Sequence, residues 1–303
     1  MLRINKLTNK KKLIVIAGPT ASGKTALAIE LAKALQTVIL SADARQFYRE
    51  MQIGTAKPTE AELNAVQHYF IDNLSIHDDY DAGKYEAEVI QLLDKLFLQH
   101  DSVILCGGSG LFIKAVTDGF DEIPETTPEV REQVQQLYAQ NGLSWLQETI
   151  LQKDPVYYQN ADIQNPKRLL RALEVITQTG NPFSSYHKQH QQQRNFDVIK
   201  ICISIDRDLL YERINQRVIN MFDAGLEDEV KALIPYQQLN ALQTVGYTEL
   251  FEFFDGKISK KRALELIQQH TRNYAKRQLT WFRKDSGFIW CKPDLNEILP
   301  LCK

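Results

Sequence analysis

The sequence has few cysteines, and they show no pattern of metal ligands. Its four cysteines are far apart, form no C-x-x-C pair and lie near no histidine motif; they are Cys106, Cys202, Cys291 and Cys302. Cys106 and Cys202 end or lie within apolar runs, so we expect buried thiols there. The composition therefore argues against a metal centre built on cysteine.

Long apolar runs are also missing. No apolar stretch approaches the 18 residues needed to cross a membrane. The basic segment Met1 to Lys12 is followed only by the short run Leu13 to Ala17, too short for the core of a secretory signal. A hydrophobic share of 44% with 24% charged residues is typical of a soluble enzyme. We therefore expect a cytoplasmic protein that contacts no membrane.

Net charge is nearly absent, because the chain sums to −2, which alone argues against a nucleic-acid partner. The distribution argues otherwise. Between Lys257 and Lys284 there are nine basic residues and one acidic residue, Glu265, so the rest of the chain sums to −10 (27 basic against 37 acidic residues). A basic patch on an acidic body indicates an electrostatic contact with an anionic partner such as nucleic acid.

The most informative stretch is a phosphate-loop motif, G-x-x-x-x-G-K-T, between the apolar run Leu13 to Ala17 and a helical segment that begins at Ala26. Glycines let consecutive N–H groups form an anion nest at a helix N-terminus. Lys24 adds a charge for the terminal phosphate, and the Thr25 hydroxyl is placed to ligate Mg²⁺. The predicted diphosphate or triphosphate site consists of Gly18, Pro19, Thr20, Ala21, Ser22, Gly23, Lys24 and Thr25.

Two further strand ends carry polar residues. The predicted strand Val38 to Leu40 leads to Asp43 and Gln46, and the strand Val103 to Cys106 leads to a second glycine-rich turn that contains Ser109. Ligands lie beyond the carboxyl ends of parallel strands, so we expect these residues at the same rim as Lys24. For Asp43 a helix N-cap or an ordinary loop carboxylate is the alternative. For Ser109 a ligand contact and a helix cap remain equally open.

Later segments read mainly as helices. Proline-punctuated helical segments from Thr117 onward predict a helical insertion, in which Lys167, Arg168 and Arg171 form either a functional basic face or a solvated one. The segment from Asp206 to Phe222 predicts a helix that carries arginines for phosphate contact. The segment Ser259 to Lys284 predicts a long helix with its core side at Leu264, Ile267, Tyr274 and Trp281 and with Arg272, Lys276 and Arg283 on another face.

His68 begins the predicted strand His68 to Asp72. A histidine at a strand start is more often structural than catalytic, and we expect a structural role. Together these segments predict an α/β fold. Its core comprises residues 1–117 and 198–303, with a parallel sheet flanked by helices, and residues 118–197 form the helical insertion.

The ordered series of motifs resembles the tRNA dimethylallyltransferases (tRNA isopentenyltransferases), and it spans nearly the whole chain. The motifs are Gly18 to Thr25, Ser41 to Gln46, Gly54 to Pro58, Gly107 to Leu111, Arg168 to Val175, Val245 to Tyr247 and Thr271 to Arg283. The resemblance implies a core like that of P-loop kinases and NTPases, with an insertion that clasps the anticodon stem-loop. It also implies transfer of a dimethylallyl group from dimethylallyl diphosphate to N6 of adenosine 37 in tRNA.

The resemblance also implies roles for particular residues. Asp43 would be the general base, Ser109 would take the place of the family's usual threonine, and Lys24, Thr25 and Arg217 would hold the diphosphate and Mg²⁺. The positions expected to contact tRNA are Asp43, Ala44, Arg45, Gln46, Ser109, Arg131, Lys167, Arg168, Leu169, Leu170, Arg171, Gln243, Thr244, Val245, Gly246, Tyr247, Thr248, Lys276, Arg277, Gln278, Leu279, Thr280, Trp281, Phe282 and Arg283. We expect a monomer.

The sequence departs from the family pattern at Ala44, Ser109, Phe112 and Thr248, which bears on tRNA affinity rather than on the reaction. Two other classes also explain the phosphate loop. A P-loop kinase for a small molecule accounts for the loop and Asp43 but not for the basic C-terminal helix. An RNA-binding protein switched by ATP, without covalent chemistry, accounts for both.

Overall fold

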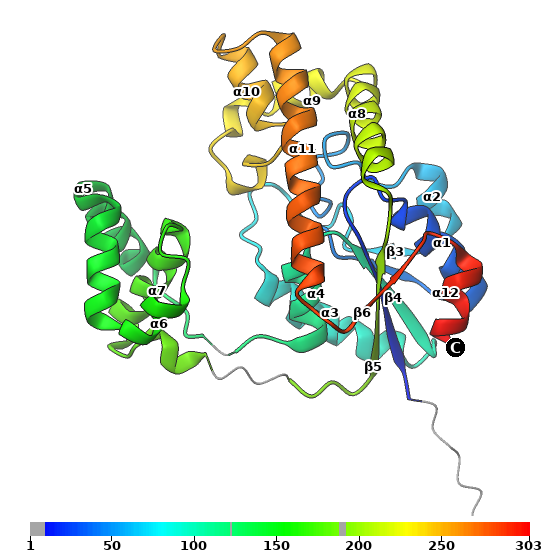
Figure 1. Cartoon of the computed structure of the whole chain (residues 1–303), viewed down its shortest axis with the longest axis horizontal. Coiled ribbons are helices and arrows are strands. Elements are labelled where there is room, and N and C mark those ends of the chain that lie inside the picture. Colours follow the sequence, from blue (N-terminus) through cyan, green and yellow to red (C-terminus); the bar gives the residue numbers. More distant parts are fainter. Residues whose placement is uncertain (1–9, 122, 188–191) are drawn as a thin grey trace, which may run out of the picture. The chain divides into compact units, whose positions relative to one another are not determined.

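The computed structural model describes residues 10–121, 123–187 and 192–303 of the chain (Figure 1). The chain divides into a core unit, Met1–Asp118 with Gln193–Lys303, and an insertion unit, Gly119–Gln192. The predicted insertion, 118–197, starts one residue before this unit and ends five residues after it.

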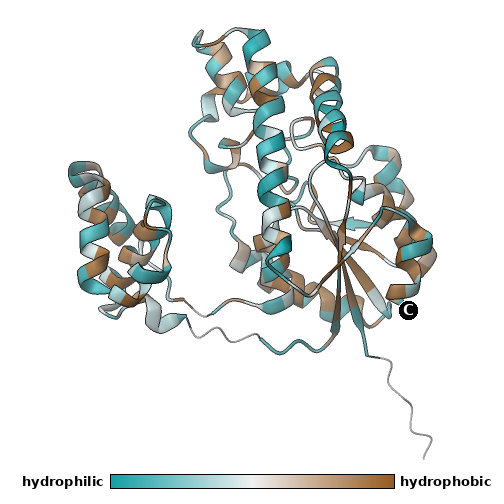
Figure 2. Ribbon diagram, in the orientation of Figure 1, coloured by the Kyte–Doolittle hydropathy of each residue, from teal (hydrophilic) through white to brown (hydrophobic). Residues whose placement is uncertain are grey.

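The core unit is built on a parallel six-stranded sheet in the order β3-β2-β4-β1-β5-β6. The central strands β1 and β4 are buried after their first residue because helices cover both faces of the sheet, and Figure 2 shows most of their length in brown. The predicted α/β class with a parallel sheet is confirmed. The strands are β1 (Lys12–Ala17), β2 (Ile39–Ser41), β3 (His68–Tyr69), β4 (Ser102–Gly107), β5 (Asp197–Ile203) and β6 (Phe288–Cys291).

Several helices of the core unit start at side-chain caps that are visible in the sequence. Thr59 and Glu62 form a capping box, and Asp81, Asp206 and Ser259 each accept backbone N–H groups. The helices are α1 (Lys24–Leu35), α2 (Glu60–Ala65), α3 (Ala82–Leu96), α4 (Gly110–Asp118), α8 (Arg207–Asp223), α9 (Leu226–Ala232), α10 (Thr248–Phe254), α11 (Lys260–Arg283) and α12 (Leu295–Cys302).

Two predictions about these elements are wrong in detail. The strand predicted for His68 to Asp72 is only two residues long, because Phe70 and Asp72 adopt the left-handed backbone (φ 62° and 55°) and break it. On α11, Trp281 is 39% exposed instead of lying in the core. The buried stripe there runs through Ala275 and Phe282, one residue further along the chain than predicted.

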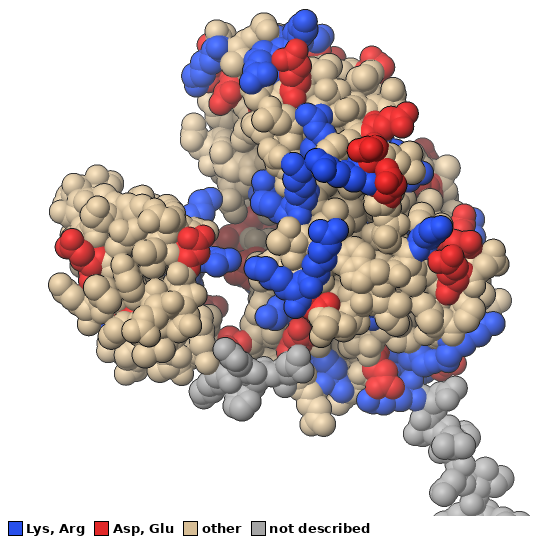
Figure 3. All heavy atoms as spheres, in the orientation of Figure 1, with Lys and Arg blue, Asp and Glu red and all other residues tan. Residues whose placement is uncertain are grey.

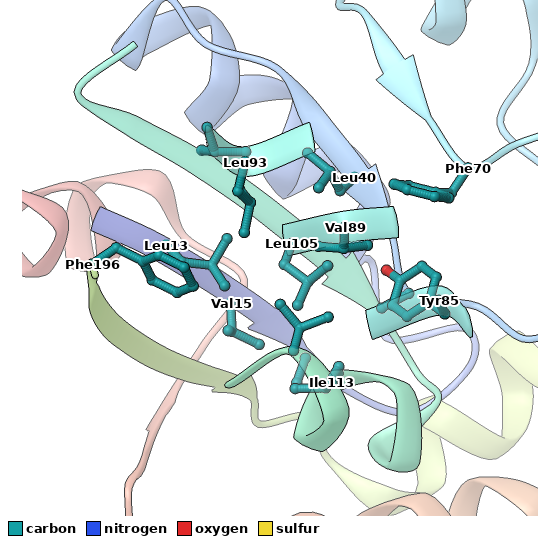
Figure 4. Packing of buried hydrophobic residues seen from close by; sticks show 14 of the residues in the cluster. Leu13, Val15, Leu40, Phe70, Tyr85, Val89, Leu93, Leu105, Ile113 and Phe196 are labelled. Carbon is teal, nitrogen blue, oxygen red and sulfur yellow. The ribbon is translucent and has the colours of Figure 1, made fainter. Parts of the chain in front are cut away.

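The core packs on both faces of the sheet because successive residues of a strand point to opposite sides. Leu13 and Val15 of β1 pack with Leu105 and with Tyr85 of α3 on one face (Figure 4). Ile14 and Ile16 of β1 pack with residues of α1 and α12 on the other face. Cys106 and Cys202 are buried in these clusters, as predicted.

The insertion unit has its own apolar cluster. Its helices are α5 (Pro128–Lys153), α6 (Pro155–Asn160) and α7 (Pro166–Thr179). Each starts with proline after a capping residue, because proline fits the first helical position, where no N–H is needed. In neither unit do the described residues form a helix with the length and apolarity to cross a membrane.

Candidate active site

The phosphate loop leaves β1 and enters α1 at the carboxyl edge of the sheet. Gly23 has the left-handed φ of 91° and precedes α1 without a side-chain cap, so the first N–H groups of α1 remain available. Such N–H groups at a helix N-terminus attract anions. The loop therefore has the strand–loop–helix geometry that a phosphate site requires.

Two adjoining pockets lie beside this loop, both within the core unit. The small pocket, about 200 Å³, lies between the phosphate loop, the end of β2, α2 and the start of β3. The large pocket, about 600 Å³, lies between the loop that follows β2, the segment before α10, and α11. Six residues line both pockets: Thr20, Lys24, Asp43, Thr55, Ala56 and Arg217.

Two cations mark the junction of the pockets. Lys24 Nζ donates to the Pro19 carbonyl (3.3 Å), and Arg217 of α8 donates to Thr20 Oγ1 (3.3 Å). Burial lowers the pKa of Lys24, although Asp43 acts in the opposite direction, and burial lowers the pKa of Arg217. Neither cation forms an ion pair with a carboxylate of the described residues. Buried cations without a counterion favour an anionic ligand.

Asp43 is a loop carboxylate at the same junction. Its Oδ1 accepts from the Arg45 N–H (3.0 Å), and the residues that follow form turns, so the helix-cap alternative is wrong. No described residue donates to its Oδ2. A carboxylate with one oxygen anchored and the other free can accept a proton from a ligand in either pocket.

Ser109 joins the two strand ends that the sequence analysis placed at one rim. Its Oγ accepts from the Ala44 N–H (3.0 Å), which links the turn after β4 to the turn after β2. The turns approach so closely that a Cβ on Gly107 would lie 2.1 Å from the Ala42 carbonyl oxygen, so glycine is required there. Tyr274 lines the large pocket together with Ser109, and its pKa is raised to about 12, mainly by burial and then by the charge of Asp43.

The glutamine of α11, Gln278, bridges two loops. Its Oε1 accepts from the Thr20 N–H (2.9 Å), and its Nε2 donates to the Gly108 carbonyl (2.9 Å). Gln278 therefore holds the phosphate loop against the glycine turn after β4.

Four residues that were predicted to contact tRNA have buried side chains: Leu169, Tyr247, Gln278 and Phe282. Of these, Gln278 lines the large pocket, whereas the side chains of the other three line neither pocket and are not a contact surface. Leu169 belongs to the apolar cluster of the insertion unit. The motif of each residue lies on a helix or turn that has one side in the core and the other in solvent. Each motif therefore contains buried packing residues next to exposed polar ones.

The exposed basic members of the predicted set lie on α11 and on the insertion unit. Figure 3 shows Lys and Arg side chains gathered along α11, where Lys276, Arg277 and Arg283 are exposed. In the insertion unit, Lys167 and Arg168 are exposed. There Arg131 and Arg171 both donate to Thr126 Oγ1 (3.0 and 2.8 Å), an arrangement that spacing alone did not reveal.

The large pocket is also lined by the segment from Gln243 to Thr248, apart from the buried Tyr247. Arg45 donates to the Gln243 carbonyl (3.5 Å), which ties this segment to the turn that carries Asp43. Glu249 accepts from the Gly246 N–H (2.7 Å) and pairs with His270 (2.6 Å). The structure therefore brings the predicted segments at Asp43, Gln243 and Tyr274 to one pocket.

Sequence reasoning missed the group that holds the loop between the pockets. Glu229 of α9 accepts from the N–H groups of Gln52, Ile53 and Gly54 (2.7–3.0 Å) and from the Tyr247 hydroxyl (2.6 Å). Thr55 and Ala56, which follow directly, line both pockets. A lone glutamate in a charged helix carries no signal for such a role, because only tertiary contact reveals it.

We predict that Glu229→Gln destabilises the fold by about 1–3 kcal/mol, because an amide nitrogen cannot accept the backbone N–H groups that a carboxylate oxygen accepts. The loop beside Thr55 should loosen, and hydrogen exchange at Gln52 to Gly54 should become faster. The control is Asp228→Asn, an exposed neighbour on the same helix. Equal exchange and equal unfolding midpoints in both variants would contradict this role.

The chain matches the family model described as IPP transferase over residues 46–285. Proteins from Christiangramia forsetii and Cytophaga hutchinsonii, both named tRNA dimethylallyltransferase, are similar to it. The first is 49% identical over 284 residues, 94% of each chain, and the second is 47% identical over 289 residues, 95% of each chain.

Solved structures agree. The tRNA isopentenylpyrophosphate transferase of Bacillus halodurans superposes with a TM-score of 0.70 at 32% identity, over 96% of this chain and 94% of that one. A eukaryotic dimethylallyltransferase acting on tRNA superposes with a TM-score of 0.78 over 95% of this chain and 75% of that one; at 22% identity it supports the fold alone. Because the family model covers most of the chain and the relatives match nearly its full length, the chain belongs to the IPP transferase family.

Proposed function

We infer that this chain transfers the dimethylallyl group of dimethylallyl diphosphate to N6 of adenosine 37, beside the anticodon of tRNA. The products are N6-(dimethylallyl)adenosine and diphosphate. The observation that carries this function is the identity of 49% over 94% of both chains to a protein named tRNA dimethylallyltransferase. The junction of the two pockets supports it, because it offers cations for a diphosphate beside a free carboxylate oxygen.

The chemistry assigns a role to each group at the junction. An exocyclic amine is a poor nucleophile and must lose a proton, so Asp43 acts as the general base. The leaving diphosphate develops negative charge, which Lys24, Arg217 and the N–H groups of the phosphate loop stabilise. The bond between the dimethylallyl carbon and the diphosphate oxygen breaks, and a bond from that carbon to N6 of the adenosine forms. For this the two substrates must meet beside Asp43.

A magnesium ion fits the small pocket as part of this proposal. The described residues contain no cluster of three acidic, histidine or cysteine side chains that would form a protein metal cage. Mg²⁺ instead binds through one or two protein ligands plus substrate phosphates, and the Thr25 hydroxyl lies in the wall of the pocket. The ion would neutralise part of the diphosphate charge.

The large pocket is the proposed entry for the RNA. An adenine stacked in a loop must leave the stack to reach an enclosed site. Arg277 and the Gln243 to Thr248 segment line this pocket, and the exposed cations of α11 continue beyond it. These groups, with Ser109 and the exposed basic residues of the insertion unit, are the proposed contacts with the anticodon stem-loop.

The test is incubation of the chain with labelled dimethylallyl diphosphate and unmodified tRNA. Label in the RNA at the adenosine beside the anticodon is the expected result. Transfer of the γ-phosphate of ATP to a small molecule would instead identify a kinase. ATP-dependent RNA binding without covalent labelling would identify an RNA-binding switch, and either outcome would overturn the proposal.

For the basic surface of α11, we predict that Lys276→Ala and Arg283→Ala each weaken tRNA binding and reduce its salt slope by about one. Both side chains are exposed, and each lies over an aromatic ring, at 5.9 Å from Tyr211 and 6.0 Å from Trp290. Filter binding across a salt series measures the slope. Affinity for prenyl diphosphate should stay unchanged, and Lys95→Ala on α3 is the matched control.

A further inference from the structure

Two buried side-chain polar atoms of the described residues lack a hydrogen-bond partner, Ser22 Oγ and His68 Nε2. Both residues belong to the wall of the small pocket. Buried polar atoms are normally paired, so each unpaired one calls for an explanation. A polar ligand in this pocket is one source of the missing partners.

The hydrogen-bond partner of His68 decides which ring nitrogen carries the hydrogen. His68 pairs with Ile39 across β3 and β2, and its Nδ1–H donates to the Val66 carbonyl (2.8 Å). A carbonyl can only accept, so Nδ1 carries the hydrogen and Nε2 of the neutral ring is a bare acceptor. Burial lowers the pKa of His68 below its ordinary 6.5, against the opposing Val66 bond and the charge of Glu62.

Several charged and titratable groups share the wall of the small pocket with His68. They are Lys24 of α1, Asp43 after β2, Glu62 of α2, Cys106 of β4 and Arg217 of α8. A diphosphate adds several negative charges to this wall. Negative charge nearby favours the protonated imidazole and raises the pKa of His68. A protonated Nε2 can donate to a phosphate oxygen, whereas the bare acceptor cannot.

We propose that His68 takes up one proton from solution at Nε2 when a diphosphate enters the small pocket, and that it then donates a hydrogen bond to that anion. His68 is thus a further diphosphate-binding residue, and binding of the prenyl donor is coupled to pH. The proton returns to solution when the diphosphate product leaves. The inference rests on the proposed function for the identity of the donor, but the coupling itself needs only a diphosphate.

The direction of the pH dependence follows from the two protonation states. The pKa of His68 is higher in the complex than in the free chain. Between these two pKa values every binding event takes up a proton, so affinity rises by up to about tenfold for each unit that the pH falls. Below the pKa of the free chain His68 is already protonated, and its contribution to the pH dependence disappears.

The experiment is calorimetric titration of the full chain with inorganic diphosphate and with dimethylallyl diphosphate. It is run between pH 7 and 8 in two buffers of different ionisation enthalpy, which gives the number of protons taken up. His68→Asn keeps a donor for Val66 and removes Nε2, while His68→Gln places an uncharged donor near the position of Nε2. His100→Asn is the matched control, because His100 also contacts a backbone carbonyl through Nδ1 (3.2 Å, to Gln36) but does not line the small pocket.

The chain and His100→Asn should each take up about one proton more than His68→Asn, which removes protonation of the ligand itself from the comparison. His68→Gln should bind diphosphate and take up about as many protons as His68→Asn does. Thermal melts confirm that the variants fold. Equal uptake in the chain and His68→Asn, or no diphosphate binding at all, would overturn the proposal. Label transfer to tRNA is measured separately, so active enzyme without His68-dependent uptake refutes only this inference. Uptake without transfer refutes only the function.

Discussion

Asp43→Asn should lower the rate of dimethylallyl transfer by about 10²–10⁴-fold, the usual worth of a positioned general base. The variant should fold normally, because the asparagine oxygen can still accept from the Arg45 N–H as Asp43 Oδ1 does (3.0 Å). Affinity for the prenyl diphosphate and for tRNA should change little, since the substitution preserves shape and hydrogen-bonding capacity. Single-turnover transfer to a saturating anticodon stem-loop measures the effect.

Running that assay at low and high Mg²⁺ distinguishes the roles of Asp43. A missing base does not respond to extra metal, whereas a missing metal contact is partly rescued by it. Near wild-type rates would remove Asp43 from the chemistry. Rescue by Mg²⁺ would assign the carboxylate to the metal instead.

Lys24→Met should lower both affinity for dimethylallyl diphosphate and the transfer rate, the latter by about 10²–10³-fold, the usual worth of a group aimed at developing charge. Methionine nearly matches the length of lysine but has no charge. The pKa of Lys24 is lowered by burial, so removal of this cation should not destabilise the fold. Calorimetry gives the affinity, and single-turnover assays give the rate.

The matched control for Lys24→Met is Lys33→Met, an exposed lysine in the last turn of the same helix. It should bind and react as the unchanged chain does. Unfolding midpoints should be similar for both variants. A loss of stability in Lys24→Met with unchanged transfer per folded molecule would contradict a role for Lys24 in holding the diphosphate.

The local features of the site could be predicted from sequence alone. The phosphate loop from Gly18 to Thr25 is contiguous. Its glycines, lysine and threonine specify the turn from strand to helix through interactions between neighbouring residues. The placement of Asp43 and Ser109 at the same rim followed because parallel strands present their carboxyl ends together. The α/β class could be predicted because short apolar strand segments and amphipathic helical segments follow one another along the chain.

Other features depend on contacts between distant residues, and only the tertiary structure decided them. Gln278 bridges two loops, Glu229 holds the segment between the pockets, and His68 lines the small pocket with its Nε2 buried and unpartnered. Glu229 and His68 lie in no local pattern that distinguishes them from a helix glutamate or a strand histidine. Gln278 lies in the motif Thr271 to Arg283, but the motif does not reveal that it bridges two loops. Their roles arise where separate elements pack, because burial and partners are properties of the assembled chain and not of neighbours in sequence.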